Sequence, residues 1–231
     1  MPLMRIILIL VLCLYFPACK TAKSLYKISI TPDVRMGQEI SPPGNAVNFE
    51  KEGIWGAVRP VSCQDLTAPS SLNREWDFKN PFEGIYDEAG MPIAFYLLIE
   101  NRSDSSITFN PSSSFSLTDA GAPLFTIEYD DLYQDLYDSE KGAGQLENIR
   151  KMLFRSYQTL GPGEHALGLL LFRRPDEPKI KSKELSFHIH RIYAGSREID
   201  FAISFKIRME EIPDAPPDET AHPQTFQDEQ H

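Results

Sequence analysis

The stretch from Met91 to Ser103, MPIAFYLLIENRS, decides the fold that we expect for this chain. Every second residue from Ile93 to Ile99 would lie on one face of a strand, and the residues between them on the other face. Both faces are apolar, which is typical of a strand covered on two sides in the centre of a sandwich. The run is too short to cross a bilayer as a helix, because a span needs about 20 apolar residues.

Shorter segments of alternating apolar and polar residues follow along the chain. They are separated by turn residues, and the last two are joined at Ala194–Ser196 as a predicted hairpin; the segments are 105–110, 115–118, 124–128, 165–172, 184–193 and 197–209. Short strands separated by turn signals every 8–12 residues or so are typical of an all-β sandwich.

The region before the central strand carries weaker signals. Residues 32–52 hold several prolines and glycines, which favours an irregular loop. Residues 53–66 form a candidate strand, but Pro60 inside it has no N–H to donate to a ladder. The sequence therefore predicts that this strand lies at the edge of a sheet.

Residues 128–154 break the strand pattern and predict a helical insertion. Aromatic and aliphatic residues recur there at i, i+3, i+4, i+7 and i+8, which marks one face of an amphipathic helix: Tyr129, Leu132, Tyr133, Leu136 and Tyr137. A second short helical stretch is expected after Gly144.

The three tyrosines of this insertion are the candidate partner-contact residues, Tyr129, Tyr133 and Tyr137. An exposed aromatic patch would bind a partner, and the alternative is that the rings cover the sandwich as core.

The acidic residues of the same stretch lack the alternating spacing and the central glycine of a calcium-binding loop. We interpret them as the solvated face of the helix.

Composition narrows the classes of partner and chemistry. The chain has 231 residues and a net charge of −10, so we expect no nucleic-acid partner. Only Cys63 of its three cysteines belongs to the expected folded body, which excludes an internal disulfide. The sequence contains no nucleophile-elbow, zinc-protease or phosphate-loop motif. We expect a protein that is not an enzyme and has no cofactor.

Two histidines are the candidate metal ligands. His188 and His190 are two residues apart on a predicted strand, so both point to the same face. They could bind a transition metal if a third ligand came from elsewhere in the fold. The preferred interpretation is an exposed polar face, because Leu185, Phe187 and Ile189 occupy the opposite, core-facing side of the strand. We therefore predict no metal.

The N-terminal residues predict where the protein is sent in the cell. Arg5 precedes an unbroken apolar run from Ile6 to Tyr15, and Ala18-Cys19 follows. These residues resemble a bacterial lipoprotein signal, in which the chain is cut before the cysteine and the cysteine carries the lipids. Lys20 in place of aspartate resembles lipoproteins that are passed to the outer membrane. The alternative is an ordinary signal peptide, which gives a periplasmic or secreted protein.

A second resemblance concerns the body of the chain. The order of strand and turn patterns is similar to that of immunoglobulin-like accessory domains of bacterial lipoproteins and exported proteins. The patterns are Phe95-x-Leu-x-Ile-x-Asn101, Asn110-Pro111, Leu160-x-Pro-Gly-Glu164 and Gly168-x-Leu-x-Phe172. The resemblance implies an immunoglobulin-like antiparallel β-sandwich and an exported setting. It implies no catalytic residues.

These observations predict an organisation and a function. We expect a signal peptide at 1–18, a lipidated tether at 19–25 that begins at Cys19, a β-sandwich domain at 26–209 with the helical insertion at 128–154, and a disordered acidic tail at 210–231. The predicted function is a membrane-anchored, non-catalytic interaction or assembly module of the cell envelope, with a possible envelope protein as partner. The alternative is a periplasmic protein that binds a small ligand or a metal.

Overall fold

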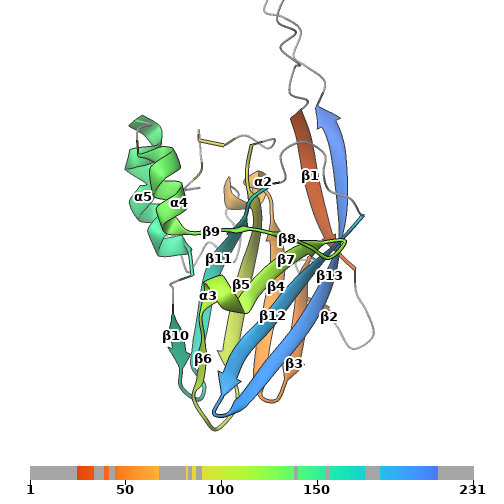
Figure 1. Ribbon diagram of the computed structural model, residues 1–231, viewed down its shortest axis with the longest axis vertical. Coiled ribbons are helices and arrows are strands. Elements are labelled where there is room, and N and C mark those ends of the chain that lie inside the picture. The colour runs from red at the N-terminus through yellow and green to blue at the C-terminus, as the bar shows by residue number, and fades with distance from the viewer. Residues whose placement is uncertain are drawn as a thin grey trace, which may run out of the picture. The chain divides into compact units, whose positions relative to one another are not determined.

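The alternating strands build two antiparallel sheets that pack face to face (Figure 1). The computed structural model describes residues 25–33, 39–41, 45–67, 82, 85–86, 90–137, 140–154, 157–174 and 183–212. The first sheet has the order β1 (Leu25–Pro32), β13 (Arg197–Ile212), β12 (Glu184–Ala194), β6 (Ile107–Phe109) and β10 (Gln158–Leu160), and β7 (Phe115–Asp119) pairs with β12 and with β8 (Ala122–Leu124). The second has the order β2 (Glu39–Ser41), β3 (Ala46–Lys51), β4 (Ile54–Val61), β5 (Ile93–Asn101), β11 (His165–Phe172) and β9 (Thr126–Ile127).

Strand β5 lies in the middle of the second sheet, between β4 and β11. Its inner residues Phe95, Leu97 and Ile99 belong to the core between the sheets, whereas Ala94 and Tyr96 belong to a separate apolar cluster on the outer face. Both faces of the strand are therefore covered, as its two apolar faces predict. The expected mainly β sandwich is confirmed, and an immunoglobulin-like strand order stays a prediction.

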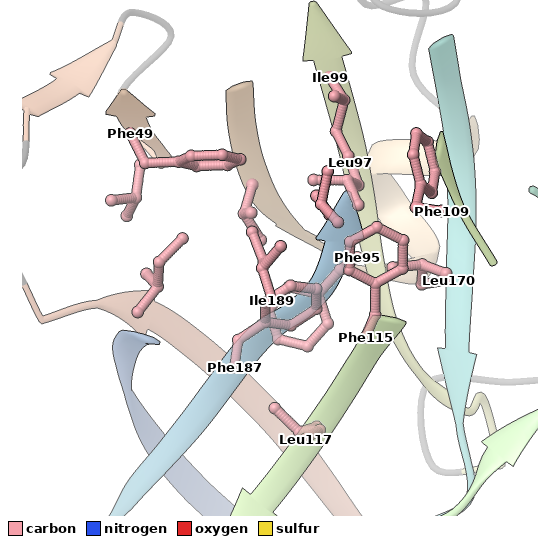
Figure 2. Close-up of a cluster of buried hydrophobic side chains, with 14 of the residues drawn as sticks. Phe49, Phe95, Leu97, Ile99, Phe109, Phe115, Leu117, Leu170, Phe187 and Ile189 are labelled. Atoms are coloured by element: carbon pink, nitrogen blue, oxygen red, sulfur yellow. The ribbon is translucent and has the colours of Figure 1, made fainter. Parts of the chain in front are cut away.

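Phenylalanines are the largest side chains in the core between the sheets (Figure 2). Phe187 of β12 lies 5.2 Å from Phe95 of β5 and 6.2 Å from Phe115 of β7, measured between ring centroids. Such distances are typical of aromatic pairs that stabilise a core beyond the burial of their area. The two sheets are thus joined by ring contacts that cross the sandwich.

The predicted helical insertion is confirmed as a pair of helices, α4 (Tyr129–Leu136) and α5 (Glu140–Met152). Their apolar residues belong to the same buried cluster as the outer face of β5 and β11; the buried helical residues are Leu132, Leu136, Leu146, Ile149 and Met152. Two shorter helices are α2 (Cys63–Thr67) and α3 (Pro111–Ser114). Helices α4 and α5, together with Leu66 of α2, therefore cover the second sheet on the face that the first sheet leaves open.

Two predictions about the first strands are wrong. Strands β2 and β3 form within the segment 32–52 that we expected to be an irregular loop, and Val47 and Phe49 of β3 are buried. Strand β4 lies between β3 and β5 and is not at an edge. Pro60 pairs with Phe95 of β5, but the pairing of β4 with β3 stops at Val58. Proline is tolerated at this position because β4 has only one paired neighbour there.

The last two strands form the predicted hairpin, with Gly195 at a φ of 63° in the turn. Strand β13 continues to Ile212, three residues into the segment that we predicted as the tail. The predicted signal peptide, Cys19, most of the tether and the remainder of the tail lie outside the described residues. Among the helices that the structure describes, none is long and apolar enough to span a membrane.

Candidate functional site

The three predicted contact tyrosines form one aromatic row on α4, which we call the tyrosine face (Tyr129, Tyr133 and Tyr137). Tyr129 is half-buried, whereas Tyr133 is 41% and Tyr137 57% exposed. The rings of Tyr133 and Tyr137 are stacked with centroids 4.9 Å apart, and Tyr129 lies 6.2 Å from Tyr133. The exposed end of the row is thus outside the core, and its role in binding a partner stays a prediction.

The helix is held in place by residues on its other side. Leu132 and Leu136 are buried against the second sheet, so α4 cannot turn the tyrosine face inward without exposing them. Partial loss of hydration, together with the neighbouring phenol of Tyr137, raises the pKa of Tyr133 above its ordinary value. The phenol of Tyr133 therefore stays uncharged at neutral pH, and its hydroxyl can donate a hydrogen bond.

Asp131, at the start of α4, holds the helix end in place. Asp131 accepts a hydrogen bond from the Glu128 N–H at 3.0 Å in a capping box, and it forms an ion pair with Arg173 at 3.2 Å. Asp130 lies in the same first turn and is exposed. Acidic residues at a helix start also complement the helix dipole.

The two candidate metal ligands lie on the outer face of β12, half-buried. His188 Nε2 is 3.2 Å from the hydroxyl of Thr118 on β7. A β-bulge follows His190, with Arg191 at a φ of 54°. Within the part of the chain that the structure describes, no group of three or more potential metal ligands comes together. The third ligand that a metal site would need is not supplied by these residues.

A cavity of about 570 Å³ opens where the helix pair meets the edge of β11; we call it the edge cavity. Its walls come from α3, β9, β11 and the ends of α4 and α5, and its lining residues are Pro111, Ser112, Thr126, Ile127, Glu128, Tyr129, Asp130, Arg150, Lys151, Leu153, Phe154, Leu169, Leu170 and Leu171. Sites for small molecules typically measure about 300–1,000 Å³. The edge cavity is therefore large enough for a small ligand.

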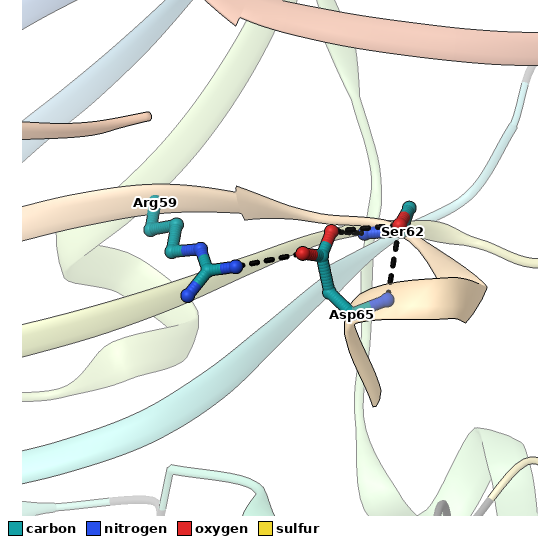
Figure 3. Close-up of polar contacts among 3 residues, drawn as sticks. All are labelled: Arg59, Ser62 and Asp65. Atoms are coloured by element: carbon teal, nitrogen blue, oxygen red, sulfur yellow. Dashed lines mark hydrogen bonds and ion pairs between the residues drawn. The ribbon is translucent and has the colours of Figure 1, made fainter. Parts of the chain in front are cut away.

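A polar cluster around the buried Arg59, at the end of β4, is a feature that the sequence pattern did not lead us to expect (Figure 3). Arg59 Nη2 donates to Asp65 Oδ1 at 2.7 Å, and Asp65 Oδ2 accepts from the N–H and the hydroxyl of Ser62 at 2.8 and 2.7 Å. The Ser62 hydroxyl accepts from the Asp65 N–H in return, at 3.1 Å. This reciprocal pair is a capping box for α2, and the pattern Ser-x-x-Asp could have revealed it.

The charge of Arg59 is the unusual part of this cluster. The residue is only 7% exposed and lies opposite Tyr96 in the pairing of β4 with β5. Its Nε and Nη1 atoms are buried and make no hydrogen bond with the residues that the structure describes. Burial raises the pKa of Tyr96, so its phenol stays neutral. Asp65 is therefore the carboxylate that balances this guanidinium, and the cluster fixes α2 to the sheet.

No family model and no curated protein matches the chain. The crystal structure of the yjhA protein from Bacillus subtilis is similar, with 12% identity, a TM-score of 0.37, and coverage of 67% of this chain and 93% of that chain.

Proposed function

We propose that this protein is a lipid-anchored, non-catalytic interaction or assembly module of the cell envelope that contacts a protein partner through the tyrosine face. The observation that carries the proposal is the exposure and stacking of Tyr133 and Tyr137 on a helix whose opposite side is buried. Tyrosine supplies a large, rigid contact area with a polar tip, at a low cost in conformational entropy. A tyrosine row on a fixed helix is thus suited to recognition.

The proposed anchor is Cys19. The apolar run from Ile6 to Tyr15, together with Ala18-Cys19, resembles a lipoprotein signal, and Lys20 favours an outer-membrane destination in that family. Five residues separate Cys19 from Leu25, the first residue of β1, so the six residue steps between them can span at most about 20 Å. The acidic chain would gain little from anionic lipid headgroups, so acyl chains would have to supply the membrane affinity. An ordinary signal peptide would instead give a periplasmic or secreted protein.

Site-specific photocrosslinking in intact cells tests the contact. A photoreactive amino acid at position 133 should give a discrete adduct with an envelope protein, and Tyr137→Ala should weaken it. The matched control is position 193, because Tyr193 on β12 is also 41% exposed. Equal crosslinking from both positions, or an adduct that Tyr137→Ala leaves unchanged, would show that the tyrosine face is not a contact surface.

Point substitutions are a sharper test here than removal of the insertion. The helix pair covers Tyr96, Leu169 and Leu171 on the outer face of the second sheet. A chain without α4 and α5 would expose this apolar surface and would lose stability for reasons unrelated to partner binding. Tyr133 and Tyr137 lie outside the buried apolar cluster, so their replacement should change the surface and leave the fold intact.

The alternative of a small-ligand protein is favoured by the edge cavity and not by the histidines. His188 and His190 would need a further ligand from outside the described residues to hold a metal. If a transition metal bound there, His188→Ala would abolish binding in a metal titration. The edge cavity has both the volume and the charged rim that a small organic ligand would use.

A further inference from the structure

The edge cavity lies at a gap in the covering of β11. Strand β9 pairs with Leu171 and Phe172, while Leu153 forms an isolated parallel bridge with Leu169, supported by the hydrogen bond from the Phe154 N–H to the Leu169 carbonyl at 3.3 Å. Leu170 lies between these two coverings, and Leu169 to Leu171 all line the cavity. The strand edge is therefore open to the cavity over a short length.

The walls of the cavity are fixed by core packing. Phe154 contacts the rings of Phe109 and Phe115 in the core between the sheets, whereas Leu153 packs against the outer cluster. Phe154 can lie this close to β11 because residue 168 is glycine: a Cβ there would be 2.3 Å from the Phe154 ring. The cavity is thus a preformed feature of the sandwich edge, and preformed sites bind at a lower cost in ordering.

The rim of the cavity carries opposite charges on two sides. α4 and α5 follow each other directly in an antiparallel pair, so the first turn of α4 and the last turn of α5 lie at the same end (Figure 1). Glu128 and Asp130 of the first and Arg150 and Lys151 of the second line the cavity. Glu147 pairs with Arg150 at 2.9 Å and with Lys151 at 3.5 Å, which leaves one net positive charge on the basic side.

The floor between these charges is apolar. Ile127 and Leu153 are half-buried and line the cavity, so part of their surface remains for a ligand to cover. Removal of apolar surface from water drives binding, while a few charged groups orient the ligand. The complementary ligand has an apolar body with a cation near Asp130 and an anion near Arg150 and Lys151.

We propose that the edge cavity binds a zwitterionic, amphipathic molecule of the size of a short apolar peptide. Its ammonium group meets Glu128 and Asp130, its carboxylate meets Arg150 and Lys151, and its side chains cover Ile127 and Leu153. This site needs neither the lipid anchor nor Tyr133 and Tyr137, so it stands or fails separately from the proposed envelope contact.

Calorimetric titration of the purified full-length chain tests the site with three related probes: trileucine, N-acetyl-trileucine and trileucine amide. Trileucine should bind saturably, and each blocked terminus should weaken binding about tenfold, which is about 1.4 kcal/mol. In Asp130→Asn, acetylation of the amino terminus should lose most of its effect while amidation keeps it. Arg150→Gln should give the converse pattern.

Two further variants separate the cavity from the general surface. Ser112→Trp would fill the cavity from its rim and should abolish binding, whereas Asp104→Asn, a matched loss of charge outside the cavity, should leave the affinity unchanged. The side chains of Ser112, Asp104, Asp130 and Arg150 are all exposed, so the variants should fold. The proposal is overturned if trileucine does not saturate the protein or if Ser112→Trp binds trileucine as tightly as the wild-type chain does. It is also overturned if acetylation of trileucine costs Asp130→Asn as much affinity as it costs the wild-type chain.

Discussion

Replacement of Asp65 by alanine should destabilise the protein strongly, although Asp65 itself is only half-buried. The change removes the capping box of α2, which is worth about 1 kcal/mol. It also leaves the buried guanidinium of Arg59 without the carboxylate that lies 2.7 Å away, and loss of a charged hydrogen bond adds about 2 kcal/mol. We expect a loss of about 3 kcal/mol in the free energy of unfolding.

Asp131→Ala is the matched control for this prediction. Asp131 also holds a capping box and an ion pair, but its partner Arg173 is exposed to solvent. Exposed ion pairs contribute about 0.2–1 kcal/mol, so with the cap this variant should lose only about 1.2–2 kcal/mol in total. The difference between the two variants measures what burial of Arg59 adds.

Urea unfolding followed by tryptophan fluorescence provides both values. The double variant Arg59→Met, Asp65→Ala should recover much of the loss, because it replaces the unbalanced charge with an unbranched apolar side chain. The reasoning is refuted if Asp65→Ala and Asp131→Ala differ by less than about 0.5 kcal/mol. It is equally refuted if the double variant is no more stable than Asp65→Ala alone.

Two further predictions concern packing and titration. Gly168→Ala should cost about 1–3 kcal/mol in thermal unfolding because its Cβ would meet the Phe154 ring, whereas Gly144→Ala in α5, with no atom within 4 Å, should stabilise the protein by up to about 1 kcal/mol. The hydrogen bond from Arg150 holds the pKa of Glu147 below its ordinary value. The stabilisation from this pair is therefore fully present at a pH above the unfolded-state pKa of Glu147, and it is lost as the pH falls through the folded-state pKa. In an NMR titration, Arg150→Gln should raise the pKa of Glu147, and an unchanged pKa would contradict the pairing.

The sequence was most informative where periodicity and burial agree. Strand β5 has apolar residues on both faces, and that pattern alone predicted its central place. Strand β3 was missed because prolines and glycines precede it, although the alternation of Val47 and Phe49 is the ordinary signal of a half-buried strand. Pro60 led us to predict a strand at the edge of the sheet, because the sequence shows only that this residue lacks an N–H donor. It does not show that the pairing of β4 with β3 has already ended at Val58.

The sites depended on information that spacing does not contain. Helical spacing placed the tyrosines in one row, but a buried row and an exposed row have the same spacing. The structure separates them because Leu132 and Leu136 occupy the buried side. The edge cavity could not be predicted, since its walls come from segments that only the tertiary fold brings together.

The most direct test of the proposed envelope function is incorporation of labelled palmitate, combined with partitioning into a detergent phase. The wild-type chain should carry the label and enter the detergent phase, and Cys19→Ala should lose both properties. Cys13→Ala, which removes a cysteine inside the apolar run, should keep both. An unlabelled, water-soluble wild-type chain, or a Cys19→Ala chain that remains labelled, would contradict the account.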